Sequence, residues 1–226
     1  MSSSTLATSR PRTGAIALAA DYVELTKPRI AVLVLVVIIA SAVMAAWTTG
    51  ASINGWAVLH ACLGTLLVAS SASAANQWME IRRDARMNRT ADRPLPAGRI
   101  SSTGALVFAG VTLLAGLLYL AFTLPQSAVL WAVLTWLLYV AVYTPLKPIS
   151  SANTAVGAVA GALPVFIGWS AVSESLDIRT VALFLTLYLW QFPHFMAIAW
   201  LYREDYARGG YKMLPVVDPS GRRAGV

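Results

Sequence analysis

Residues 54–96 read NGWAVLHACLGTLLVASSASAANQWMEIRRDARMNRTADRPLP, an apolar segment that passes directly into a charged one. About 20 apolar residues are the length that an α-helix needs to cross the hydrocarbon core of a bilayer. Beyond them, Asn76, Glu80 and Asp84 follow at intervals of four residues, so on a continuing helix their side chains form one column of oxygen ligands. The stretch therefore predicts a membrane-spanning helix with a ligand-rich end.

Arginines crowd this column, and Arg83, Arg89 and Arg93 are the members that we expect to contact a substrate. Carboxylate and amide oxygens suit a hard cation such as Mg²⁺, and guanidinium groups suit phosphate oxygens. Pro94 and Pro96 then end the helix. The pattern predicts a site for a diphosphate, and the alternative is an ordinary positive loop with a few stabilising pairs.

Composition places the chain in a membrane. Of its 226 residues 58% are hydrophobic and only 12% are charged, whereas soluble domains carry about 25% charged residues. Cys62 is the one cysteine, which excludes a disulfide framework. The net charge of +7 fits positive loops on one side of a bilayer better than nucleic-acid binding, so we expect no nucleic-acid partner.

The predicted fold is an all-α polytopic transmembrane bundle in the lipid bilayer. Six apolar windows are long enough to span it: residues 29–48, 54–75, 102–123, 126–143, 152–172 and 180–201. With the N-terminus inside, every basic residue except Arg179 falls on the inner side, as the positive-inside rule requires. The column then lies at the inner, cytoplasmic face.

Residues 1–20 contain no acid and are rich in Ser and Thr, and we expect them to form a disordered tail before a single domain over residues 21–226. This composition suits a bacterial tail or a mitochondrial transit peptide. The expected location is the bacterial plasma (inner) membrane, with the mitochondrial inner membrane as the alternative.

A second candidate group is Tyr143 and Lys147, at the inner end of the fourth window. A lysine ammonium group is a compact point charge for phosphate oxygens. Pro145 and Pro148 make an unbroken helix doubtful here. The alternative is a lysine that snorkels to the membrane interface beside a belt tyrosine.

A third group accompanies the sixth window. Gln191 and His194 are polar residues inside an apolar segment, and such residues usually face the bundle interior or a cavity. Glu204 and Asp205 follow at the inner end and suit a second metal or a clamp on one diphosphate. A solvated helix end is the alternative for this acid pair.

Two further features are weaker. Arg29, in the run Lys27-Pro28-Arg29, mainly serves topology and helix initiation, and a phosphate contact is its less favoured role. Gly157 and Gly161 are four residues apart and permit close helix packing.

The run from Asn76 to Pro96 resembles the first aspartate-rich motif of the UbiA superfamily of intramembrane prenyltransferases. Four other segments are similar to the subgroup of that superfamily that farnesylates haem: ELTKPRI (24–30), YTPLK (143–147), NTAVGAVAGALPVFIGW (153–169) and LWQFPHFMAIAWLYREDYARGGYKMLPVV (189–217).

The resemblance implies a helix bundle around a cavity in which farnesyl diphosphate meets haem b. It implies Mg²⁺ on Asn76, Glu80 and Asp84, with Lys147 completing the catalytic set. Haem A synthase would be a partner. The expected substrate-binding residues are Arg29, Arg83, Arg89, Arg93, Tyr143, His194, Glu204 and Asp205. The alternatives are another prenyl acceptor, such as a quinone precursor or chlorophyllide, and a non-catalytic transporter or haem-handling protein.

The chain departs from the family pattern in three places. Glu80 stands where many relatives have aspartate, which keeps a carboxylate. Pro148 stands where the subgroup often shows arginine. The family also usually has about three further spans after the segment that matches residues 215–217, so we expect this chain to be a fragment or a shortened form that lacks them.

Overall fold

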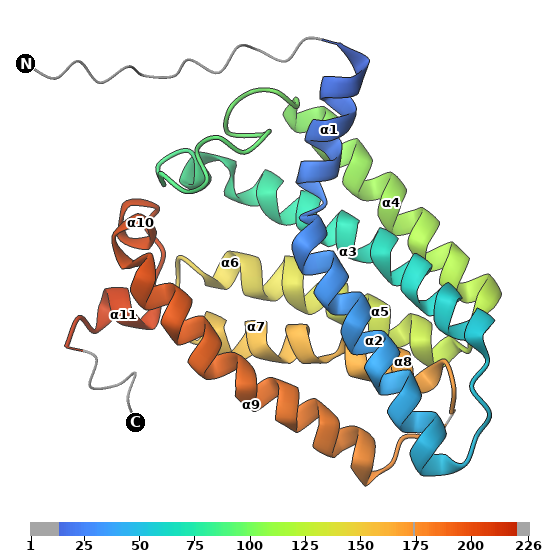
Figure 1. Ribbon diagram of the computed structural model, residues 1–226. Coiled ribbons are helices and arrows are strands. Elements are labelled where there is room, and N and C mark those ends of the chain that lie inside the picture. The colour runs from blue at the N-terminus through green and yellow to red at the C-terminus, as the bar shows by residue number, and fades with distance from the viewer. Residues whose placement is uncertain (1–13, 174, 221–226) are drawn as a thin grey trace, which may run out of the picture.

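Every regular element is a helix in residues 14–173 and 175–220, the part of the chain that this computed structural model describes (Figure 1). The elements in chain order are α1 (Ala15–Leu25), α2 (Pro28–Thr49), α3 (Gly55–Asp84), α4 (Ser102–Thr123), α5 (Gln126–Leu137), the π-helical segment η1 (Leu138–Tyr143), α6 (Thr144–Leu146), α7 (Asn153–Ala162), α8 (Pro164–Ser170), α9 (Ile178–Leu201), α10 (Arg203–Arg208) and α11 (Leu214–Val217).

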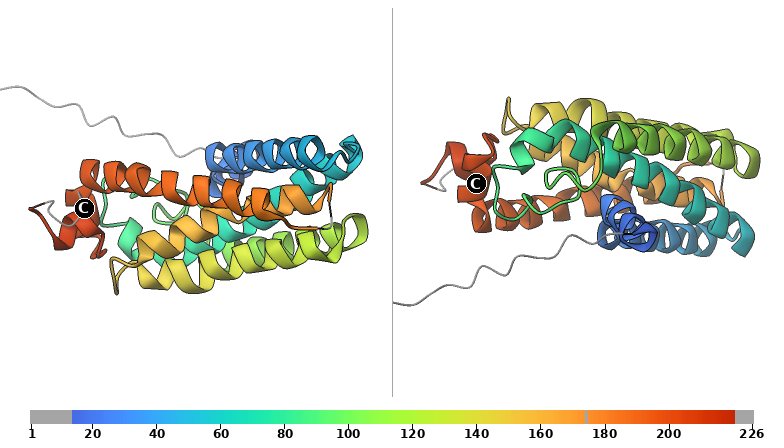
Figure 2. Two further views of the ribbon diagram at one scale, coloured as in Figure 1. Left: turned by 90° about the horizontal axis from the view of Figure 1, so that it is seen from below. Right: turned by 90° about the horizontal axis from the view of Figure 1, so that it is seen from above.

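Six of these helices or continuous helix runs are long and apolar enough to cross a bilayer, which confirms the predicted number of spans. They are Pro28–Thr49, Gly55–Asp84, Ser102–Thr123, Gln126–Leu146, Asn153–Ser170 and Ile178–Leu201. Figure 2 shows them side by side in one bundle, with α10 and α11 together at one end. The protein is a multi-pass membrane protein.

Local sequence signals explain where the spans begin and end. Asn54 caps α3 by accepting hydrogen bonds from the backbone N–H groups of the next turn, and Ser101 caps α4 in the same way. Gly50 ends α2 in the left-handed conformation that glycine adopts without strain. Asp177 begins α9 with a complete capping box.

Small residues allow the spans to approach closely. On α4, a side-chain carbon at Gly116 would lie 2.9 Å from Leu67 and Val68 of α3. On α8, a side-chain carbon at Gly168 would overlap the backbone carbonyl of Ile38 in α2. In lipid, where the hydrophobic effect does not drive helices together, close backbone approach gives the van der Waals contact that holds α4 against α3 and α8 against α2.

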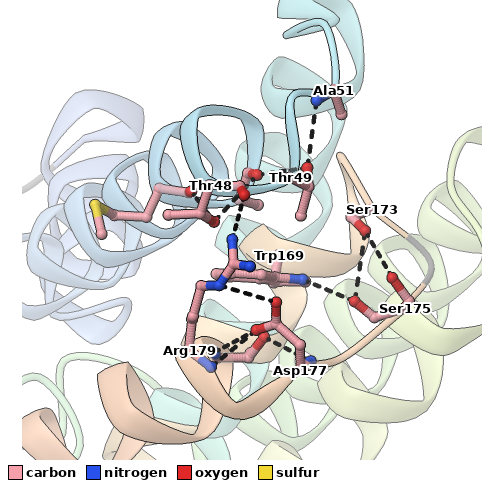
Figure 3. Close-up of polar contacts among 11 residues, drawn as sticks. Thr48, Thr49, Ala51, Trp169, Ser173, Ser175, Asp177 and Arg179 are labelled. Atoms are coloured by element: carbon pink, nitrogen blue, oxygen red, sulfur yellow. Dashed lines mark hydrogen bonds and ion pairs between the residues drawn. The ribbon is translucent and has the colours of Figure 1, made fainter.

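The bundle is also tied together at the end remote from α10 (Figure 3). The Arg179 guanidinium donates to the Thr48 carbonyl at the end of α2 and pairs with Asp177 at 3.4 Å. Nearby, the Trp169 indole donates to the Ser175 carbonyl at 3.0 Å. The one basic residue predicted on the outer side thus joins α2 to the start of α9.

The structure corrects two boundaries. Residues 15–20 belong to α1 rather than to a disordered tail, and the Arg99 guanidinium holds this helix through Asp21 at 2.8 Å and Glu24 at 3.2 Å. Of the rest of the predicted tail, Gly14 is the N-cap residue of α1, and residues 1–13 lie outside the described residues. The helix that carries the polar column ends at Asp84, ten residues before Pro94, where its end was predicted, and the chain continues from Ala85 in turns and bends.

Candidate active site

Asn76, Glu80 and Asp84 lie in one column at the end of α3, as their spacing predicted, and all three are almost fully buried. Burial makes their polar groups costly unless they are hydrogen-bonded or paired with opposite charge.

Each member of the column is held by a cation from a different part of the chain. Lys27, at the start of α2, donates to Asn76 Oδ1 at 2.8 Å. The other two contacts are Lys147 Nζ to Glu80 Oε1 at 2.7 Å and Arg93 to Asp84 Oδ2 at 2.7 Å. Arg93 and Lys147 balance the two carboxylates, and Lys27, when protonated, gives the site an excess of positive charge that favours an anionic ligand.

A short relay fixes the amide of Asn76. Its Nδ2 donates to Thr144 Oγ1 at 3.0 Å, and the Thr144 hydroxyl donates to the Tyr139 carbonyl at 2.8 Å. The π-helical turn of η1 makes this last contact, which spans five residues. Single π-turns inside α-helices often occur at functional sites.

Lys147 follows this π-turn, and the expectation of a broken helix before it is wrong. The Lys147 N–H still donates to the Tyr143 carbonyl at 3.2 Å, because the helix passes Pro145 through the wider turn. The ammonium group lies 4.6 Å from the centre of the Tyr143 ring. Burial alone would lower the pKa of Lys147, but the Tyr143 and Glu80 side chains raise that pKa well above its ordinary value.

Lys27 is the site residue that sequence reasoning missed. Its φ is +54°, which makes it the one non-glycine residue with positive φ in the described part of the chain, and strained backbone of this kind gathers at functional sites. Gln77 Nε2 donates to the Leu25 carbonyl at 2.7 Å and fixes the same joint. Burial, helped by the charges of Arg93 and Lys147, lowers the pKa of Lys27 to about 7.

The other predicted arginines lie elsewhere. Arg29 is exposed. Arg83 donates to the carbonyls of Gly209 and Gly210, both at 3.1 Å. Arg89 stacks on Tyr202, with its guanidinium carbon 4.6 Å from the ring centre. Their proposed contacts with substrate therefore remain predictions, and Arg93 is the member that reaches the column.

The two acids beyond α9 do not join the column. Asp205 is buried and accepts from the backbone N–H groups of Asn88 and Arg89 and from Arg208. Glu204 is exposed in a cleft of about 290 Å³. Since this cleft is lined by Asn88, Leu201–Asp205 and Arg208, it shares no lining residue with the column.

The two polar residues of the sixth span face different ways. Gln191 is buried and donates to the Ala158 carbonyl at 2.9 Å, as predicted. His194 is exposed and stacks on Trp190, with ring centres 5.0 Å apart, so its predicted position in the interior is wrong. Positions three apart on a helix differ by about 60° around the axis, enough to separate a buried from an exposed face.

The column offers the donor chemistry that Mg²⁺ requires, two carboxylates and an amide oxygen. Among the described residues, no three His, Cys, Asp or Glu side chains form a ready metal cluster. The protein ligands are thus few, which suits a cation that is usually bound through one or two carboxylates plus substrate phosphates. The residues fit a Mg²⁺-diphosphate better than a metal held by protein alone.

The sequence and the fold together define the class of protein. The family model described as "UbiA prenyltransferase family" matches residues 34–226, and the chain belongs to this family. One relative is a protoheme IX farnesyltransferase of Koribacter versatilis, which is 42% identical over 98% of this chain and 72% of its own length. Another is the protoheme IX farnesyltransferase of Rhodopirellula baltica, which is 47% identical over 89% of this chain and 70% of its own length. The mitochondrial protoheme IX farnesyltransferase of Arabidopsis thaliana is 43% identical over 89% of this chain and 46% of its own length.

Solved structures confirm the fold. A UbiA homologue from Archaeoglobus fulgidus bound to DMAPP and Mg²⁺ has a TM-score of 0.73, with 19% identity over 90% of this chain and 71% of that one. The same homologue bound to GPP and Mg²⁺ gives a TM-score of 0.72 over the same shares.

Proposed function

We propose that this chain transfers the farnesyl group of farnesyl diphosphate to a vinyl group of haem b, giving haem O, at the buried end of α3. The observation that carries the proposal is the set of three cations on the column, Lys27, Arg93 and Lys147. The acceptor is inferred from the relatives, which are protoheme IX farnesyltransferases.

In the proposed reaction, the bond between the allylic carbon of farnesyl and the diphosphate oxygen breaks, and its electron pair leaves with the diphosphate. Lys27, Arg93 and Lys147 turn toward the phosphate oxygens, where their charge counts most as negative charge grows on the leaving group. Asn76, Glu80 and Asp84 would hold Mg²⁺, which, when bound, supplies further Lewis-acid stabilisation of that group.

The vinyl group of haem b then supplies the electron pair for the new carbon–carbon bond. Water adds to the carbocation that results and loses a proton, which gives a hydroxyethylfarnesyl side chain. The chemistry needs no covalent enzyme nucleophile, so the side chains act by position and charge. A site within the membrane also limits the water that could capture the allylic cation too early.

The remaining assignments belong to the same proposal. His194 stays the candidate for a contact with the haem, and Glu204 and Asp205 stay candidates for a second metal or a clamp on the diphosphate. We place the N-terminus on the cytoplasmic side of a bacterial plasma membrane, with the mitochondrial inner membrane as the alternative. Haem A synthase, which would consume the product, stays a proposed partner.

The test is production of haem O. The chain is expressed in a cell that makes haem b but lacks its own haem farnesyltransferase, and the extracted haems are identified by mass spectrometry. We expect haem O from the wild-type chain and none from Asp84→Ala at matched expression. Farnesyl diphosphate binding without haem O would redirect the proposal to another acceptor, and full activity of Asp84→Ala would overturn the site.

A further inference from the structure

Residues 209–212, between α10 and α11, are tied by backbone contacts to two walls of the site. The Arg83 guanidinium of α3 donates to two carbonyls of this segment, and the Lys212 N–H donates to the Lys147 carbonyl at 2.8 Å. Gly210 makes the turn with φ of +69°, a conformation that a side chain would strain. The position of Tyr211 is therefore fixed by both α3 and the end of α6.

Tyr211 is buried beside the charges of the site, and 3% of its surface is exposed. Its ring centre lies 5.8 Å from the Lys147 ammonium and 5.7 Å from the Arg83 guanidinium carbon. A tyrosine hydroxyl is protonated at neutral pH, since its ordinary pKa is about 10, so it can donate a hydrogen bond.

The hydroxyl of Tyr211 lies close enough to the Glu80 carboxylate to interact with it, but it makes no hydrogen bond of full geometry within the described part of the chain. A buried donor without a partner carries a desolvation cost, and such groups are rare in folded proteins. Phenylalanine would fill the same space without that cost. The retained hydroxyl, next to Lys147 and Glu80, thus indicates a partner that arrives with the ligand.

We propose that the Tyr211 hydroxyl donates a hydrogen bond to an oxygen of the substrate's diphosphate. The inference rests on the proposed function, because the diphosphate must lie beside Lys147 and the column. It gives the segment between α10 and α11 a direct part in binding, although the acids Glu204 and Asp205 point elsewhere.

The test compares wild type with Tyr211→Phe, using a non-reactive farnesyl thiodiphosphate with Mg²⁺ as the probe. We expect the affinity of Tyr211→Phe for the probe to fall about tenfold, the scale for a hydrogen bond to a charged acceptor. We expect the thermal unfolding midpoint without ligand to stay the same or rise, because a buried unpaired hydroxyl is removed. Unchanged affinity would overturn the inference.

Three controls separate a direct contact from other roles. Tyr206→Phe, in the neighbouring helix α10, removes a hydroxyl that receives a hydrogen bond from Arg89, and we expect its affinity for the probe to match wild type. Farnesol, which lacks the diphosphate, should bind Tyr211→Phe and wild type equally, and a loss there would assign Tyr211 to shape alone.

The Mg²⁺ concentration that half-saturates probe binding is the third control, and we expect it to stay within about twofold of wild type, a shift of a few tenths of a kcal/mol. A larger rise would mean that Tyr211 acts through Glu80 and would overturn the direct contact. A wild-type chain that does not bind the probe would overturn the proposed function itself. Equal binding of the probe by wild type and by Tyr211→Phe would overturn only the role of Tyr211.

Discussion

The ammonium nitrogen of Lys147 lies 2.7 Å from a carboxylate oxygen of Glu80, a residue 67 positions earlier in the chain. Both side chains are buried, so neither charge has water to replace its partner. This contact joins the end of α6 to α3 and fixes two walls of the site against each other.

We predict that removing one partner of this pair costs more stability than removing both. Lys147→Gln leaves Glu80 buried and unpaired, and such a loss typically costs about 3–5 kcal/mol. The Glu80→Gln/Lys147→Gln double variant removes both charges and should recover most of that loss. Thermal unfolding in detergent, followed for the single and double variants, measures the difference.

Activity separates the structural from the functional role of the pair. The double variant should remain about 100-fold or more below wild type in haem O formation, because it lacks both a phosphate cation and a metal ligand. A double variant that recovered both stability and activity would reduce the pair to a structural tie.

A second prediction concerns Lys27. Lys27→Met should weaken binding of farnesyl thiodiphosphate by at least about tenfold, since one charge-assisted hydrogen bond contributes about 1.5–3 kcal/mol. Arg29→Gln is the matched control two residues away, where the side chain is exposed, and we expect its affinity to match wild type. If Arg29→Gln lost affinity and Lys27→Met did not, Arg29 would be the phosphate contact, as the sequence suggested, and the assignment of Lys27 would be wrong.

Lys27 also shows why the sequence predicted some of the site and not the rest. Asn76, Glu80 and Asp84 lie on one helix, so the helical repeat alone places them together. Lys27 reaches them through a left-handed turn between α1 and α2, and no repeat encodes such a turn. Its neighbour Arg29 carries the same charge, and sequence alone offered no means to choose between them.

The acids after α9 show the opposite case, in which residues that the sequence predicted for the site lie outside it. Glu204 and Asp205 follow a span that ends on the same side as the column, and from sequence they suit a second metal. In the structure Asp205 caps the loop at Asn88 and Arg89, a tertiary contact that residue type does not reveal. Span number and helix type, in contrast, follow from apolar length and were predicted correctly.

A third prediction concerns the metal. Chelation with EDTA should abolish haem O formation, and added Mg²⁺ should restore it. Asp84→Asn should need a higher Mg²⁺ concentration for half-maximal activity than wild type, because an amide oxygen replaces a carboxylate as ligand. The Mg²⁺ dependence of initial rates gives both values, and activity that survives full chelation would contradict the assignment of the column.

The last prediction concerns the packing that supports Tyr143. A side-chain carbon at Gly157 of α7 would lie 2.8 Å from Cε2 of the Tyr143 ring, closer than real contacts allow. Because the Lys147 ammonium lies over that ring, Gly157→Ala should displace the ring and disturb the lysine. We expect lower thermal stability and affinity for the thiodiphosphate about fivefold or more below wild type, a loss of about 1 kcal/mol.

Gly110 of α4 provides the control for this substitution, because a side-chain carbon there meets nothing within 4 Å. Alanine favours the helix over glycine by about 1 kcal/mol, so Gly110→Ala should be as stable as wild type or more so, with unchanged affinity. If the two variants behaved alike, the contact between Gly157 and Tyr143 would have no part in holding Lys147. If Gly157→Ala lost affinity and Gly110→Ala did not, the close approach of α7 to η1 would be what holds Lys147 in contact with Glu80.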